Sequence, residues 1–206
     1  MAADCRIYID YKSPYAYLIK DRAYELEREF GFEFAWMPYV LNIPDFLGTV
    51  AGRNAHQWRR IRYSYMDARR LANRRGLTVL GPRKIFDSSI AAIAMLYAQR
   101  LGTFRRYNDL AFERFWKREL DIEDREAVRR VLDDSGTDSK AFFDFLEGQG
   151  KVELDRINLQ AEDLGVFGVP MFVIAGELFW GGDRLWMVRE KLLALADGKL
   201  PPPADR

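Results

Sequence analysis

Segments with strand character occur only near the two ends of the chain, and this distribution restricts the fold more than any other feature. Residues 5–11 read CRIYIDY, in which β-branched and aromatic residues alternate with other types, as is typical of a strand. Ser-Pro follows at once and suits a helix start, so a helix is predicted over 14–30, with Gly31 at its end. Residues 32–39, FEFAWMPY, predict a second strand. This order predicts a βαβ unit with parallel strands.

The middle of the chain shows helical periodicity instead. Apolar residues between Trp58 and Ala72 recur every three or four positions, which predicts a helix. Further helices are predicted over 90–101, 104–118, 123–132, 139–146 and 152–164. Strand character returns at 171–174 and 177–180, on either side of Ala175-Gly176, a pair suited to a tight hairpin turn. A closing helix is predicted over 184–196.

Strands at both ends with helices between them predict an α/β fold in which an all-α insertion interrupts a sheet domain. We expect the sheet domain to comprise residues 1–41 and 165–200, and the helical insertion to comprise residues 42–164. Residues 201–206, which begin with three prolines, are expected to form a flexible tail. A chain of 206 residues can bury a sizeable core without disulfides or structural metals.

Composition excludes several classes of protein. A hydrophobic fraction of 49% and a net charge of +1 do not fit intrinsic disorder. No apolar run approaches the ~20 residues that cross a bilayer, and no secretory signal is evident, so we expect a cytoplasmic protein without membrane contacts. Cys5 and His56 are the single cysteine and histidine, so no metal site of clustered Cys or His is expected. We expect Cys5 to be a buried apolar residue and His56 to have a surface or capping role.

The sharpest candidate site is the junction of the first strand and helix, Lys12-Ser13-Pro14-Tyr15. In a βαβ unit this junction lies at the carboxyl end of the strand, where open α/β sheets bind ligands. The unpaired N–H groups of a helix N-terminus stabilise an anion or thiolate, and the Ser13 hydroxyl can add a hydrogen bond. No partner base for a nucleophilic serine is evident. On the spacing alone, a serine that only caps the helix is the favoured interpretation.

A second candidate is Gly168-Val169-Pro170, directly before a predicted strand. A cis bond before Pro170 would turn the Val169 N–H and C=O outward, ready to pair with a peptide-like ligand as an added strand does. An ordinary trans proline at a strand start is the alternative, and the rarity of cis X-Pro bonds favours it.

Together, SPYAYL after the first strand, GVPMFVIAGELFWGGDRL near the end and the helical block between them resemble the 2-hydroxychromene-2-carboxylate isomerases and kappa-class glutathione transferases. The resemblance extends to about Leu195. It implies a thioredoxin-like fold, β-α-β…β-β-α, in the group that includes the periplasmic thiol-disulfide oxidoreductases. Those oxidoreductases carry C-x-x-C where this chain has SPYA at residues 13–16, so disulfide exchange at that position is chemically impossible.

The resemblance implies glutathione as a cofactor and gives Ser13 a catalytic role without a histidine. In the family, the serine hydrogen-bonds the glutathione sulfur, whose thiolate attacks the substrate. An unperturbed thiol has a pKa of about 8.5, and a hydroxyl donor at a helix terminus lowers it. The implied activity is isomerisation of an unsaturated compound by thiolate addition, bond rotation and elimination. Kappa-type glutathione transfer or peroxide reduction, and a non-catalytic thioredoxin-fold binding protein, are the alternatives.

Further residues are implied as glutathione ligands. Val169, before a cis Pro170, would pair with the cysteinyl backbone. Asp183 would take the γ-glutamyl ammonium, a role compatible with an N-cap aspartate. Asn54 matches an asparagine that precedes a Pro-Pro pair in many relatives, although residues 55–56 are Ala-His here.

Three more residues are candidates for the wall of the site. Trp180 and Arg184 either line the site or serve the fold. Lys12 departs from the small or apolar residue common in relatives at that position. It either lowers the pKa of the thiolate or points to solvent.

The segment from Arg53 to Lys84 contains ten Lys or Arg residues and one acid, Asp67. A basic helix usually presents a solvated face. If it overhangs Ser13, its arginines would attract the glycine carboxylate of glutathione and an anionic substrate. No recognisable nucleic-acid module accompanies the charge, so we expect a small anionic or electrophilic substrate and no nucleic-acid partner. The resemblance alone implies a homodimer.

Overall fold

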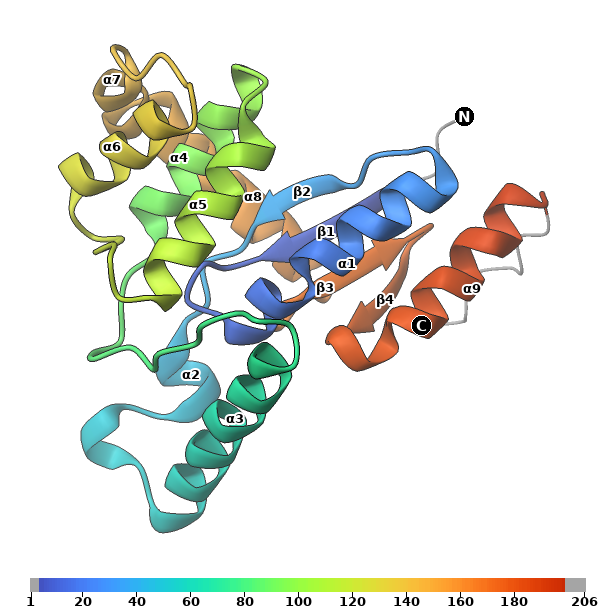
Figure 1. Cartoon of the computed structure of the whole chain (residues 1–206), viewed down its shortest axis with the longest axis horizontal. Coiled ribbons are helices and arrows are strands. Elements are labelled where there is room, and N and C mark those ends of the chain that lie inside the picture. The colour runs from blue at the N-terminus through green and yellow to red at the C-terminus, as the bar shows by residue number, and fades with distance from the viewer. Residues whose placement is uncertain (1–3, 199–206) are drawn as a thin grey trace.

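The computed structural model describes residues 4–198, with the backbone alone at residues 46 and 47. Four strands form one sheet in the order β2-β1-β3-β4 (Figure 1). The central strand β1 (Cys5–Ile9) runs parallel to β2 (Ala35–Pro38) and antiparallel to β3 (Met171–Ile174). The hairpin strand β4 (Glu177–Trp180) pairs with β3. The sheet is therefore built from both ends of the chain, as the sequence predicted.

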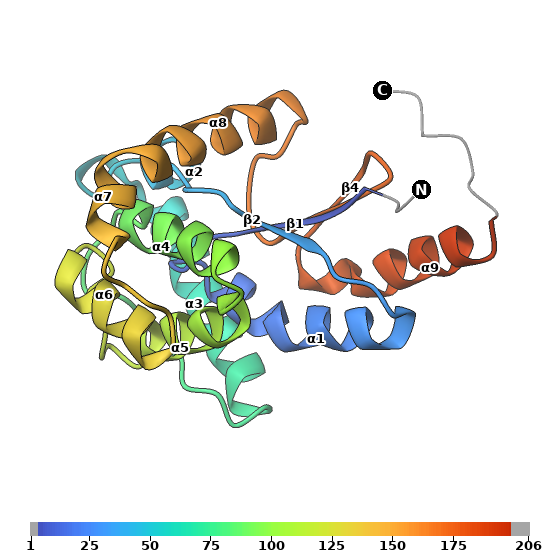
Figure 2. The same ribbon diagram turned by 90° about the horizontal axis from the view of Figure 1, so that it is seen from above.

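Helices cover both faces of the sheet. Helix α1 (Pro14–Phe30) connects β1 to β2, and α9 (Leu185–Ala196) follows β4 after a 3-10 turn at Gly182–Arg184. Seen from above, α1 and α9 lie on one side of the sheet and α8 (Gln149–Asp163) lies on the other (Figure 2). This arrangement confirms the predicted α/β class.

The other helices lie between β2 and α8 in the chain. They are α2 (Ile43–Leu47), α3 (Ala55–Asn73), α4 (Ser89–Arg100), α5 (Phe104–Trp116), α6 (Arg125–Asp134) and α7 (Phe142–Glu147), and a 3-10 turn at Val50–Gly52 precedes α3. Helix α2 and both 3-10 turns were not predicted. The division into a sheet domain and an inserted helical domain stays a prediction, and the tail at 201–206 lies outside the described residues.

The two N-terminal strands are shorter than predicted, for local reasons. Strand β1 ends at Ile9 because Asp10 starts a turn, in which its C=O accepts the Ser13 N–H at 2.9 Å. Strand β2 begins only at Ala35, since the Phe34 N–H donates instead to the buried carboxylate of Glu27, at 2.8 Å. The alternating pattern of the sequence extends beyond Ile9 and begins before Ala35, but in both places the backbone lies outside the sheet.

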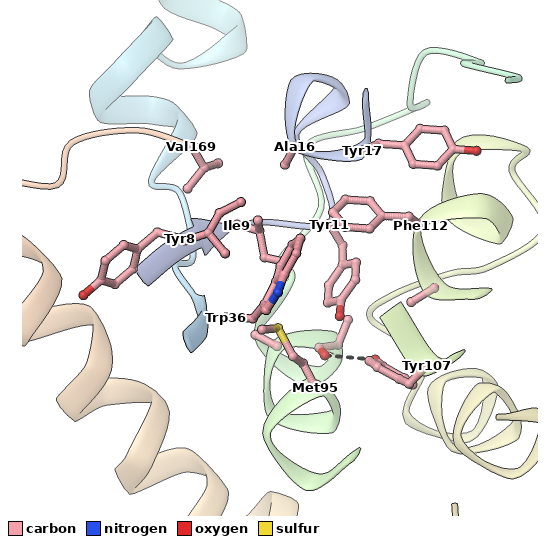
Figure 3. Close-up of a cluster of buried hydrophobic side chains, with 14 of the residues drawn as sticks. Tyr8, Ile9, Tyr11, Ala16, Tyr17, Trp36, Met95, Tyr107, Phe112 and Val169 are labelled. Carbon is pink, nitrogen blue, oxygen red and sulfur yellow. Dashed lines mark hydrogen bonds between the residues drawn. The ribbon is translucent and has the colours of Figure 1, made fainter. Parts of the chain in front are cut away.

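One continuous cluster of buried apolar residues joins the sheet to the helices (Figure 3). The Tyr11 ring, two residues beyond β1, lies 5.9 Å from Tyr107 and 4.7 Å from Phe112 of α5, measured between ring centroids. Tyr17 of α1 stacks on the same Phe112 at 5.6 Å. These contacts fix the turn between β1 and α1 from its inner side.

Among residues 4–198, none of the helices combines the length and the apolar composition that a bilayer-spanning segment needs. Nor do three or more His, Cys, Asp or Glu side chains of these residues come together in a way that could hold a metal ion.

Candidate functional site

Ser13 lies at the N-terminus of α1, where it acts as the N-cap. Its Oγ accepts the N–H of Ala16 at 3.2 Å, Pro14 takes the first helical turn, and Gly31 ends the helix with a φ of +66°. The side chain is buried, with 5% exposed. A helix of 17 residues directs the positive end of its dipole at this hydroxyl.

The turn before β3 lies next to Ser13. The Val169–Pro170 bond is cis, as the resemblance implied and against the more frequent trans form. Ser13 Oγ donates to the C=O of Val169 at 3.4 Å, so two motifs 156 residues apart in the chain come together. Within residues 4–198, no hydrogen bond uses the Val169 N–H. Gly168 packs closely here: a Cβ at this position would lie 2.9 Å from the indole nitrogen of Trp180, so the ring would have to shift.

A cavity of about 550 Å³ opens at Ser13, and we call it the serine cavity. It is enclosed by the turn after β1, the N-terminal half of α3 and the segment before β3, with Trp180 in its wall. Its charged and titratable lining includes Lys12, His56, Arg59 and Arg60, and no acidic side chain of the described residues. Much of the remaining wall is aliphatic or aromatic. The basic helix thus contributes to the wall of this cavity, and His56 is exposed at the same wall.

A second cavity of about 630 Å³ shares Tyr15, Val169 and Trp180 with the first, and we call it the Asp183 cavity. Its lining carries both signs of charge, from Asp67, Arg75, Asp183 and Arg184.

Asp183 and Arg184 form one polar unit in the lining of the Asp183 cavity. The Arg184 guanidinium lies 2.9 Å from the Asp183 carboxylate and donates to the C=O of Trp180 at 3.0 Å. The Asp183 side chain is 75% exposed, so its carboxylate is open to a ligand.

Lys12 points into the protein, which settles the orientation that the sequence left open. Its side chain is 7% exposed, and its Nζ lies 3.4 Å from Oδ2 of Asp10. The Asp10 carboxylate is fully buried and accepts the N–H groups of Lys12 at 3.1 Å and of Leu41 at 2.8 Å. Sequence reasoning missed Asp10, although an acid at the end of an otherwise apolar strand was a usable signal.

Tyr15 connects α1 to α3 through its hydroxyl. Its hydroxyl donates to the carboxylate of Asp67 at 3.1 Å and lies 3.3 Å from the C=O of Ser64. Burial raises the pKa of Tyr15, so the hydroxyl keeps its proton at neutral pH. The sequence analysis placed Tyr15 in the candidate junction but gave it no role, and it did not name Asp67 as a site residue, because their contact depends on how α3 packs on α1.

Asn54 has a different position. Its side chain accepts the N–H of Gln57 at 2.9 Å while the Gln57 side chain accepts the Asn54 N–H, which makes a capping box at the start of α3. It does not line the two cavities at Ser13. Its role as a glutathione ligand stays a prediction. Cys5 is buried in β1, and burial raises the pKa of its thiol, as suits an apolar core residue.

Comparisons with known proteins agree with this architecture. The family model of the DSBA-like thioredoxin domain matches residues 5–193. A 2-hydroxychromene-2-carboxylate isomerase of Sphingobium xenophagum is 28% identical over 190 residues, which cover 90% of this chain and 96% of that protein. An isomerase of the same name from Pseudomonas putida is 26% identical over 189 residues, 90% of this chain and 92% of that protein.

Solved structures show the same fold. A structure of 2-hydroxychromene-2-carboxylate isomerase superposes with a TM-score of 0.78 at 24% identity, over 94% of this chain and 96% of that one. A probable DsbA oxidoreductase from Streptomyces coelicolor gives 0.77 at 18% identity, over 99% and 94%. The cytosolic disulfide reductase DsbM from Pseudomonas aeruginosa, solved with GSH, gives 0.59 at 15% identity, over 95% and 98%.

Proposed function

We propose a function from the premise that this chain belongs to the family of DSBA-like thioredoxin domains. The residues at 13–16 are Ser-Pro-Tyr-Ala, so the position that carries disulfide chemistry in thiol oxidoreductases has no thiol here. We infer that the chain is a glutathione-dependent isomerase of an unsaturated, aromatic-derived compound related to 2-hydroxychromene-2-carboxylate. The observation that carries the proposal is the Ser13 hydroxyl, placed at a helix N-terminus in the wall of a cavity with apolar and cationic lining.

The residues around Ser13 suit glutathione. The unused Val169 N–H can pair with the backbone of a short peptide, as an added strand does. The Asp183 cavity, which adjoins Ser13 through Val169, has carboxylates and guanidinium groups for the ammonium and carboxylates of a zwitterion. One structural neighbour, DsbM, was solved with GSH, which supports glutathione as the first ligand to test.

When bound, glutathione would supply the thiolate that adds to a conjugated carbon and leaves again after bond rotation. The Ser13 hydroxyl proton points at the Val169 C=O across 3.4 Å, which is long for an O–H···O hydrogen bond. Redirecting this proton to a sulfur therefore gives up little. Ser13 Oγ meanwhile keeps the Ala16 N–H, and the helix terminus adds a fixed positive field. These groups are already in position before the substrate binds. Stabilising the negative charge on sulfur therefore requires no reorientation of water.

The substrate would lie in the serine cavity. Flat apolar side chains there, including Tyr63 and Trp180, suit a conjugated ring, and the cationic residues suit a carboxylate. Residues of α3 line one wall of this cavity, and the hydrogen bonds of the Tyr15 hydroxyl hold α3 in this position. Assembly as a homodimer and a cytoplasmic location stay predictions.

The test is turnover of 2-hydroxychromene-2-carboxylate with reduced glutathione, with total glutathione measured at the end. We expect isomerisation without loss of glutathione and a lower kcat for Ser13→Ala. Ser88→Ala is the control, because Ser88 is a buried serine at the N-cap position of α4, although its side chain makes no capping hydrogen bond. Stoichiometric loss of glutathione would show a transferase instead, and no turnover with no binding would favour a non-catalytic binding protein.

Binding is measured separately by thermal unfolding. At one hundred times Kd, glutathione adds ~2.7 kcal/mol to the free energy of unfolding. This raises the midpoint by about 5–10 °C for a chain of this size. S-methyl-glutathione serves as the probe without a free thiol.

A further inference from the structure

A third cavity shares lining residues with the serine cavity and none with the Asp183 cavity. It has a volume of about 250 Å³, and we call it the Lys84 cavity. The two cavities share Lys12, Ile43, Ile61 and Tyr65, so these side chains form the wall between them. We propose that Lys12 is a specificity-determining residue that binds the anionic group of the substrate at this wall. The proposal rests on the isomerase function above and assigns the substrate's orientation.

The Lys12 ammonium is a buried cation with unused donors. It has three N–H groups, and within residues 4–198 its one ion-pair partner is Asp10, at 3.4 Å. Both Asp10 oxygens are already held by backbone N–H groups, at 3.1 and 2.8 Å. A desolvated cation with free donors gains most from an anion, because water does not screen the contact. These unused donors therefore favour a ligand-binding role for Lys12 over a purely structural ion pair with Asp10.

The turn after β1 places this cation beside the reacting position. Tyr11 enters the core, with 1% exposed, while Lys12 and Ser13 both line the serine cavity. An anion held by Lys12 would therefore bring the adjoining conjugated carbons close to Ser13. Adjacent residues on one turn hold this spacing more rigidly than two residues on separate loops.

Charge in the Lys84 cavity sets the direction of the ligand. Its charged lining residues are Lys12, Arg53, Arg83 and Lys84, with no acidic residue of the described chain among them, although Lys84 is ion-paired with Glu123 outside this lining. The serine cavity is also free of acids in that part of the chain, whereas the Asp183 cavity has both signs. A zwitterionic peptide thus suits the Asp183 side, and an anionic group suits the Lys84 side. We place the conjugated carbons in the serine cavity, with the anionic end toward the Lys84 cavity.

The experiment compares two ligands of one shape, trans-cinnamate and its neutral amide trans-cinnamamide, by isothermal titration calorimetry without glutathione. We expect the wild type to bind cinnamate more tightly. Lys12→Met should weaken cinnamate binding roughly tenfold to a hundredfold, the range for a charge-assisted hydrogen bond, and leave the amide unchanged. Lys12→Arg should restore part of the preference. Lys140→Met, at a lysine with 91% exposure, is the control and should change neither affinity.

Loss of Lys12 leaves the buried Asp10 charge without its partner, so the double variant Asp10→Asn/Lys12→Met is measured alongside. Its amide binding reports whether the cavity is intact. An equal loss for both ligands would overturn the proposal in favour of a structural role. So would a wild type that binds cinnamate no better than the amide, or that binds neither at millimolar concentration.

This experiment is independent of the isomerase proposal. If Lys12 selects cinnamate but no glutathione-dependent turnover is found, the anion site stands without the proposed reaction. If turnover is found and Lys12→Met retains the wild-type ligand preference, the reaction stands and the role of Lys12 is wrong.

Discussion

Asp10 and Lys12 form a buried ion pair two residues apart in the sequence. The chain contains a second Asp–Lys ion pair of the same spacing on its surface. Asp138 and Lys140 have the same spacing, and in both pairs the aspartate accepts the backbone N–H of the lysine. The side chains of the first pair are 0% and 7% exposed, whereas those of the second are 68% and 91% exposed. Identical local chemistry is therefore present in two environments, which isolates the effect of burial.

Asp10→Asn should lower the free energy of unfolding by about 3–5 kcal/mol, because it leaves the Lys12 ammonium buried without a counter-charge. Asp138→Asn should change it by less than about 1 kcal/mol, since exposed pairs contribute little. Urea unfolding of both variants makes the comparison. The double variant Asp10→Asn/Lys12→Met should recover part of the loss. Equal effects at the two positions would contradict the buried charge at the site.

Helix α1 shows how far the sequence determines this site. Pro14 at its start and Gly31 at its end marked its bounds, and the structure has them at the predicted positions. Strand character at 171–174 and 177–180 likewise predicted β3 and β4, because short buried strands with a tight turn leave a local signal. Local rules of capping and turn formation are enough for these elements.

The rest of the site depends on packing between distant segments. The pair of Tyr15 with Asp67 and the inward orientation of Lys12 follow from the position of α3 and from the buried Asp10. No periodicity reports such contacts. The resemblance to a known family, rather than spacing, pointed to the cis bond before Pro170.

The contact between α1 and α5 predicts a specific pH dependence. Burial raises the pKa of Tyr17, whose ring stacks on Phe112, to about 12, against about 10 in the unfolded chain. Between these values the unfolded state has released the proton that the folded state keeps. The free energy of unfolding must therefore fall as the pH rises above about 10.

Tyr17→Phe keeps the stacked ring and removes the titration, so its stability should fall less steeply than that of the wild type above pH ~10. Tyr63→Phe, at a ring with 58% exposure, is the control. Urea unfolding at a series of alkaline pH values provides the test. Parallel curves for the wild type and Tyr17→Phe would argue against a buried Tyr17 hydroxyl.

The core of the molecule passes without a break from the sheet into the helices between β2 and β3. Tyr11 links the end of β1 to α5, and Trp36 of β2 lies 5.5 Å from Phe104 at the start of the same helix. Segments that are separate in the sequence therefore share one buried cluster. A cavity bounded by such segments has walls held by the same core.

We expect the chain to unfold in one cooperative transition, because neither segment can lose its packing without exposing the other's apolar surface. Differential scanning calorimetry should give a calorimetric enthalpy equal to the van't Hoff enthalpy. Two resolved transitions would show that the helical segment folds as an independent domain.

The central claim is that Ser13 stabilises a thiolate at the N-terminus of α1. Ultraviolet titration of glutathione bound to the protein measures it directly. In the wild type, the thiol pKa should lie below the value of about 8.5 for an unperturbed thiol. Ser13→Ala should raise it by roughly one pKa unit or more, the loss of a hydrogen bond to a charged group, while the fold is retained. An identical pKa in the two proteins would contradict the catalytic role of Ser13.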